Sequence, residues 1–231
     1  MRITLFATAA IGLLSTLAGT TTTGAAANPG ALRLAAADPR TAFAMISLDS
    51  GNVSVTSNAA DQRAALSIAK LYLVDYVLRH GGGAPGERDL AQRAIELSDD
   101  AAADQLDAIY PEAIDEVAGE YRLSATARGS FWGTSVTSAR DAAGFLAAKL
   151  RADAASPMLG WMRDAQPVAA DGTEQNWGTA HLPGVIGTKW GWSDDRVSEV
   201  ASASYGDRFA VAAFTAGDAD AENADLAGLG G

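Results

Sequence analysis

The sequence predicts an α/β (α+β) sandwich, in which one antiparallel sheet is covered by helices, and three observations lead to this prediction. Two alternating segments near the N-terminus are separated by Ser50-Gly51, which is typical of a β-hairpin. The middle of the chain has helical periodicity. Three more strand-like segments then close the chain. The expected strands are residues 42–49, 52–56, 185–192, 197–205 and 208–215.

The hairpin and the closing meander cannot bury an apolar face separately, so we expect one five-stranded sheet. Helices are expected at residues 64–79, from about Leu90, at 101–109 and from Thr137 to about Leu150. The first is apolar around much of its girth, which indicates a buried helix. Ser98 is a plausible N-cap for the third.

The residues from Gly217 onward are acidic and rich in alanine. We expect this tail to be frayed or weakly helical, because chain ends are poorly ordered unless they are packed down. Its acids, Asp218, Asp220 and Glu222, are expected to be solvated.

The first residues have the layout of a secretory signal peptide. Arg2 precedes a short apolar stretch, and small residues end at Ala25-Ala26-Ala27. The alternative, a transmembrane anchor, needs about 20 apolar residues, and this run is shorter. We therefore expect a cleaved leader at residues 1–27, a single mature domain at residues 28–231 without a transmembrane segment, and a protein that is secreted or held at the cell wall.

Composition excludes several function classes. The formal net charge is −11, so neither nucleic acid nor anionic lipid is an expected partner. The sequence contains no cysteine, which excludes disulfides, thiolate catalysis and cysteine metal sites. Its two histidines, His80 and His181, are far apart, and no Gly-x-Ser-x-Gly elbow is present. We expect a monomer with no metal and no cofactor.

Ser67 and Lys70 form the candidate catalytic pair. They are three residues apart in an expected helix, so their side chains share one face, and Ser67 lies near the helix start, where N–H groups favour negative charge. Burial lowers the pKa of a lysine, and a neutral amine can activate a serine hydroxyl. Ser-x-x-Lys alone is a weak signal, because a helix start followed by a lysine that extends to water also accounts for it.

Two later elements strengthen this pair. Ser98-Asp99-Asp100 opens a later helix, and Lys189-Trp190-Gly191 lies on the first strand of the meander. Together the three elements resemble the Ser-x-x-Lys, Ser-Asp-Asn and Lys-Thr-Gly signature of class A β-lactamases and penicillin-binding proteins. The resemblance covers residues 42–216 and implies a β-lactamase/transpeptidase-like fold. The short spacing from Lys70 to Ser98 indicates a trimmed helical subdomain.

The resemblance implies a role for each matching residue. Ser67 is the acylated nucleophile, and Lys70 is its base or part of a proton relay. Ser98 carries a proton to the leaving group. Lys189 lies near Ser98 and attracts the substrate carboxylate.

The strand that carries Lys189 supplies the remaining substrate contacts. Gly191 lets this strand approach the ligand, and the N–H groups of Ser67 and Trp192 form the oxyanion hole. Trp190 replaces the threonine of the family, whose hydroxyl helps to hold a substrate carboxylate. Alternation puts Trp190 and Trp192 on one face, where they either pack or form an aromatic wall for a ligand.

Asp100 replaces the asparagine of the family pattern. An amide accepts and donates hydrogen bonds, whereas a carboxylate only accepts. A negative charge beside Lys70 favours its protonated form, so we expect acylation to be slow.

Residues 122–134 correspond to the loop that carries the deacylating glutamate in class A enzymes. This segment contains no acid, and the nearest one, Glu120, is expected to belong to the preceding helix. Without that carboxylate an acyl group should leave slowly, which argues against an efficient class A β-lactamase.

Two functions remain open at this point. The first is an exported serine hydrolase or acyl-transferase that acts on D-alanyl peptides of peptidoglycan or binds β-lactams. The second is a non-catalytic relative that uses the same fold to bind peptidoglycan or a protein partner, because Asp100 and Trp190 remove two ligand contacts.

Overall fold

A computed structural model describes residue 34 and residues 37–228 of the 231-residue chain. The expected leader, residues 1–27, lies outside the described residues. Five antiparallel strands form the main sheet in the order β2-β1-β7-β6-β5. Their bounds are β1 Thr41–Ser47, β2 Val53–Val55, β5 Val185–Trp192, β6 Glu199–Gly206 and β7 Phe209–Ala216.

The N-terminal hairpin and the C-terminal meander share this sheet, which confirms the predicted architecture. They join through β1 and β7, whose register runs from Thr41 opposite Thr215 to Ser47 opposite Phe209. The edge strand β5 pairs with β6, through which it joins the rest of this sheet. It is this strand that carries Lys189, Trp190, Gly191 and Trp192.

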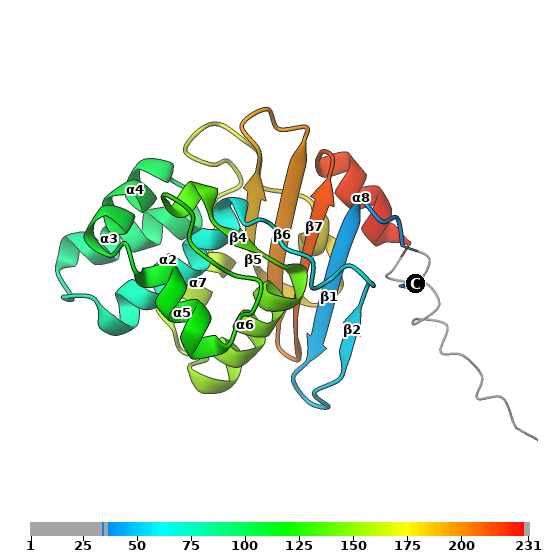
Figure 1. Ribbon diagram of the computed structural model, residues 1–231, viewed down its shortest axis with the longest axis horizontal. Helices are drawn as coiled ribbons and strands as arrows, with labels where there is room; N and C mark the ends of the chain where they lie inside the picture. Colours follow the sequence, from blue (N-terminus) through cyan, green and yellow to red (C-terminus); the bar gives the residue numbers. More distant parts are fainter. Residues whose placement is uncertain (1–33, 35–36, 229–231) are drawn as a thin grey trace, which may run out of the picture.

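Side chains alternate between two faces of the sheet, and each face packs on different helices. Ala42 and Ala44 join the large core, whereas Phe43 packs with Val211 and Leu226 on the other face. Helix α6 covers the large-core face and α8 covers the other, while Figure 1 shows α2 to α5 grouped beyond the β5 edge. Small side chains on the α6 face let the helix lie close: Ala42, Ala44, Ala201, Ala203, Ala210 and Ala212.

The helices largely follow the expected segments, with their starts shifted by local chemistry. Their bounds are α2 Ala69–His80, α3 Pro85–Glu96, α4 Asp100–Ile109, α5 Ala113–Tyr121, α6 Ala139–Ala152, α7 Pro157–Arg163 and α8 Ala219–Ala227. Short 3-10 turns are η1 Leu66–Ile68, η2 Trp132–Thr134 and η3 Gly178–His181, and a two-stranded ribbon pairs β3 Arg63–Ala64 with β4 Val136–Thr137.

Two expectations about helices were wrong, and one helix was missed. The helix expected from Ala64 begins only at Ala69, because Arg63 and Ala64 pair with β4 instead. Helix α7 was not expected at all. The acidic tail is neither frayed nor fully solvated: α8 packs on β7 and η3, Asp218 caps it by accepting from Ala221 N, and Glu222 is fully buried.

None of the helices within residues 34 and 37–228 has the length and apolar character that a bilayer crossing requires.

Candidate functional site

Ser67 lies in a tight turn just before the buried helix α2. The turn η1 spans Leu66–Ile68, and Leu66 has φ of +52°, in the left-handed region that non-glycine residues rarely adopt. Strained residues of this kind persist where the surrounding structure holds them, and they cluster at functional sites. The turn leaves the Ser67 side chain at the edge of a cleft, although the residue is largely buried.

Gly191 brings strand β5 against this turn. A Cβ at this position would lie 2.8 Å from both Ser67 N and Leu66 Cβ, closer than real Cβ contacts occur. Glycine is therefore required for the strand to pass beside the Ser67 amide. Trp192 follows on the same strand, so the two segments that carry the expected oxyanion-hole amides are adjacent.

Ser98 is not the N-cap of α4, contrary to our expectation. Asp99 caps the helix instead by accepting from Ala102 N at 3.1 Å. Ser98 has φ of +50°, which is incompatible with the extended backbone that an N-cap residue usually has. This conformation turns the Ser98 hydroxyl towards two lysine side chains.

Ser98 stands between Lys70 and Lys189 in the interior of the site. Lys70 Nζ lies 2.6 Å from the Ser98 carbonyl oxygen and 3.3 Å from Ser98 Oγ. Lys189 Nζ lies 2.7 Å from the same hydroxyl and 3.0 Å from the carbonyl oxygen of Trp190. All three side chains are buried, so these contacts form in a desolvated environment.

Asp100 approaches Lys70 from the solvent side. Its Oδ1 lies 2.5 Å from Lys70 Nζ. The pKa of Lys70 is lowered overall, because burial lowers it by more than the negative charge of Asp100 raises it. Burial and the nearby charge of Lys70 lower the pKa of Lys189 well below its ordinary value.

The two tryptophans of β5 have different surroundings. Trp190 is buried against Trp177 and Val200, and its Nε1 donates to the carbonyl oxygen of Trp177 at 2.9 Å. Trp192 lines the cleft and donates from Nε1 to Asp171 Oδ2 at 3.1 Å. Trp190 is therefore a packing residue and does not line the cleft. Of these two tryptophans, it is Trp192 that lies at the cleft wall.

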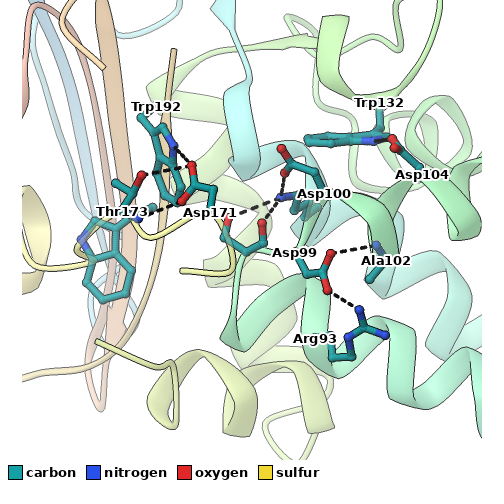
Figure 2. A network of polar contacts seen from close by, with 12 residues as sticks. Arg93, Asp99, Asp100, Ala102, Asp104, Trp132, Asp171, Thr173 and Trp192 are labelled. Carbon is teal, nitrogen blue, oxygen red and sulfur yellow. Dashed lines mark hydrogen bonds and ion pairs between the residues drawn. The ribbon is translucent and has the colours of Figure 1, made fainter. Parts of the chain in front are cut away.

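The cleft beside Ser67 has a volume of about 570 Å³. Figure 2 shows Asp100 between two walls, with Trp192 and Asp171 on one side and Trp132 and Asp104 on the other. Carboxylates outnumber cationic groups along its surface. The charged residues that line it are Asp100, Asp104, Asp171, Asp194 and Arg196.

Trp132 is a site residue to which we had assigned no role. It comes from the acid-free loop, and its ring centroid lies 4.5 Å from Lys70 Nζ. Its Nε1 donates to Asp104 Oδ1 at 2.7 Å, which fixes the indole at the cleft wall. The loop thus places an aromatic face beside Lys70, and Glu120 lies on α5 as expected. The adjacent aromatics Phe131 and Trp132 were the signal available in the sequence.

The histidines lie apart from the cleft. His80 Nε2 contacts Glu120 at 3.1 Å, and His181 Nε2 contacts Asn176 at 3.0 Å. Within the described part of the chain, no three side chains of the types His, Asp and Glu are arranged to hold a metal ion.

Comparison with known families identifies one match. The match is to the beta-lactamase enzyme family, and it covers residues 85–229, which is more than half of the chain. The matched region contains Ser98 and Lys189 and begins after Ser67 and Lys70. A search of curated proteins finds no match.

Solved structures share the fold at low sequence identity. A class A β-lactamase from Mycobacterium abscessus has a TM-score of 0.67 at 12% identity, over 82% of this chain and 92% of that chain. A D-alanyl-D-alanine carboxypeptidase from Mycobacterium tuberculosis has a TM-score of 0.59 at 17% identity, over 82% of this chain and 89% of that chain. Penicillin-binding protein D2 from Listeria monocytogenes was solved with cefotaxime bound. It has a TM-score of 0.60 at 18% identity, over 84% of this chain and 96% of that chain.

Proposed function

Because the chain belongs to the beta-lactamase enzyme family, we propose that it is a serine hydrolase or acyl-transferase and that Ser67 is its acylated nucleophile. One observation carries this proposal. The Ser98 hydroxyl is held between the buried amines of Lys70 and Lys189, and Asp100, which accepts from Lys70, lines the same cleft as Ser67. A buried network that can move a proton thus reaches the cleft in which the Ser67 hydroxyl can attack a carbonyl carbon.

We further propose that the acyl donors are D-alanyl peptides of peptidoglycan, or β-lactams that resemble them. Two of the similar structures support this choice, because one is a D-alanyl-D-alanine carboxypeptidase and the other is a penicillin-binding protein with cefotaxime bound. In this proposal the N–H groups of Ser67 and Trp192 stabilise the oxyanion, because Gly191 brings the two segments together.

Slow deacylation is part of the same proposal. The loop at residues 122–134 presents Trp132 rather than a carboxylate beside Lys70. An indole cannot act as a general base for water. We therefore expect the acyl group on Ser67 to persist, as in a penicillin-binding protein rather than an efficient β-lactamase.

The direct test is labelling of the purified mature protein with a fluorescent penicillin. We expect a covalent band from the wild type and none from Ser67→Ala. Ser124→Ala is a suitable control, because Ser124 is a serine outside the η1 turn that does not line this cleft. No band after prolonged incubation at high concentration would contradict the proposal.

A second candidate is a non-catalytic module that binds peptidoglycan or a protein partner. The observation that favours it is the contact between Asp100 and Lys70, which favours a charged lysine. If labelling fails while immobilised peptidoglycan retains the folded protein, this second function is the better one.

We also propose that the protein is exported after removal of residues 1–27. The charged start, apolar centre and Ala25-Ala26-Ala27 support this proposal. Expression in a bacterial host, followed by N-terminal sequencing of the secreted protein, should give Asn28 as the first residue. Full-length protein retained in the cell would argue against it.

A further inference from the structure

The chain contains only three lysines, Lys70, Lys149 and Lys189, and all three are buried. Burying an ammonium ion is costly unless a carboxylate and hydrogen-bond acceptors surround it. The partners of each Nζ therefore indicate which lysines are charged. Two of the three have a carboxylate on Nζ, and one does not.

Lys149 and Lys70 have the surroundings of ammonium ions. Lys149 Nζ lies 2.8 Å from Asp75 and 2.9 Å from Asp153. Lys70 Nζ has three acceptors for three hydrogens, namely Asp100 Oδ1 at 2.5 Å, the Ser98 carbonyl oxygen at 2.6 Å and Ser98 Oγ at 3.3 Å. The ring of Trp132 adds a cation–π contact.

Lys189 has different surroundings. Within residues 37–228 its Nζ has two hydrogen-bond partners, Ser98 Oγ and the carbonyl oxygen of Trp190, and no carboxylate within ion-pair distance. On β6 its register partner is Ala203, which carries no charge. The charged groups that act on it are Lys70 from α2 and Asp100 from α4, and Asp100 is already engaged by Lys70.

Two ammonium ions on either side of one buried hydroxyl repel each other, and only one carboxylate is present to offset them. Hydrogen-bond counting leads to the same result. A neutral amine has two hydrogens and one lone pair, whereas an ammonium ion cannot accept. If Lys189 is neutral, Ser98 Oγ accepts from Lys70 and donates its single hydrogen to the lone pair of Lys189, which itself donates to the carbonyl oxygen of Trp190. If both lysines are charged, neither amine can accept the Ser98 hydrogen.

We propose that Lys189, not Lys70, is the neutral amine of the resting site and the base that receives the nucleophile's proton through Ser98. This inference rests on the proposed function, because it assigns the proton transfer of the same acylation. Burial and the charge of Lys70, which lower the pKa of Lys189, agree with it. Lys70 remains an ammonium ion throughout and fixes the orientation of Ser98.

The step is balanced in atoms and charge. Ser67 Oγ bonds to the acyl carbon of the substrate as its O–H bond breaks, and that proton passes to Ser98 Oγ. The original Ser98 proton moves to Lys189 Nζ, which becomes an ammonium ion. When the acyl C–N bond breaks, Lys189 returns a proton through Ser98 to the leaving nitrogen and is neutral again.

The test is an NMR titration of protein labelled with isotope-enriched lysine at Cε, which should give three side-chain signals. Lys70→Arg and Lys149→Arg assign two signals, and the third follows by elimination, so no Lys189 variant needs to fold. Lys189→Met provides a direct check where it does fold. Lys149, held by two carboxylates, is the internal reference for a charged lysine.

We expect the Lys189 signal to change to that of a neutral amine at a pH well below the transitions of Lys70 and Lys149. In Asp100→Asn the Lys70 transition should fall by about 1 to 3 pH units, because its carboxylate is lost. A titration in which Lys189 loses its proton together with or after Lys70 overturns the inference. The titration needs no substrate and is therefore independent of labelling. If the lysines titrate in the expected order but no penicillin adduct forms, the proposed function alone is contradicted.

Discussion

Asp100 is the residue whose charge most directly affects the candidate site. Its side chain is 69% exposed, yet it contacts the fully buried amine of Lys70. Burial lowers the pKa of that lysine, and Asp100 opposes the effect. In our proposal Lys70 is charged and cannot take a proton from Ser67, which leaves Lys189 as the base.

Replacing Asp100 should therefore provide a second neutral amine. We expect Asp100→Asn to label with fluorescent penicillin faster than the wild type at neutral pH, by roughly tenfold or more. Asp104→Asn is a matched control, because Asp104 lines the same cleft but bonds to Trp132 rather than to a lysine. Equal acceleration in both variants would show that overall cleft charge, not Lys70, sets the rate.

The sequence allowed the residues of the three motifs to be named, because their order and their elements are encoded locally. It did not reveal the backbone at Ser98, whose left-handed conformation is usually signalled by glycine. Trp132 was not assigned a role, because its loop has no periodicity and only tertiary packing places it over Lys70. Asp171 was not assigned a role either, because only tertiary packing places this distant residue at the cleft.

At the scale of elements, the site depends on how closely β5 passes the η1 turn. Only a residue without a side chain fits at Gly191, because Ser67 N and Leu66 occupy the space that a Cβ needs. A side chain at this position would push β5 away from the turn and separate the amides that are proposed to bind the oxyanion. Catalysis of this kind is sensitive to such a displacement.

Gly191→Ala should lower the rate of penicillin labelling by roughly a hundredfold, comparable to the loss of one oxyanion-hole donor. Gly144→Ala is the control, because a Cβ at Gly144 meets nothing within 4 Å and lies in α6. That variant should label normally and be more stable by about 0.5 to 1 kcal/mol. Normal labelling by Gly191→Ala would mean that the close approach has no role.

Strands and long helices were predictable because their periodicity extends over whole elements. Helix α7 was missed because its seven residues are too few for a periodic pattern to emerge. Helix α8 was misjudged for another reason: its acidic composition suggests solvent, but the sheet buries Glu222. The contacts that hold this helix on the sheet involve β6 and η3, which precede it in the chain and are not evident from its own composition.

At the scale of the whole molecule, Glu222 joins α8 to the back of the sheet. The Ser202 hydroxyl donates to its Oε1, and a Cβ at Gly178 would overlap the same carboxylate. Burial raises the pKa of Glu222 from 4.5 to about 8. Within this range the folded protein holds a proton that the unfolded chain releases, so stability falls as pH rises from about 4.5 to 8.

Glu222→Gln should remove this part of the pH dependence, because an amide is neutral at every pH. We expect the difference in unfolding free energy between pH 5 and pH 8 to shrink by up to about 4 kcal/mol relative to the wild type. Denaturant unfolding at the two pH values measures it. Glu116→Gln, at an exposed position on α5, should retain the wild-type dependence. An unchanged dependence in Glu222→Gln would show that Glu222 is ionised in the folded protein.

The central claim is that Ser67 is acylated and that the acyl group leaves slowly. Intact-mass measurement after incubation with penicillin, followed by peptide mapping, tests both parts. We predict one added penicillin per chain, located on the peptide that contains Ser67, which persists after free penicillin is removed. An unmodified mass after prolonged incubation, or an adduct that forms equally in Ser67→Ala, would contradict the account.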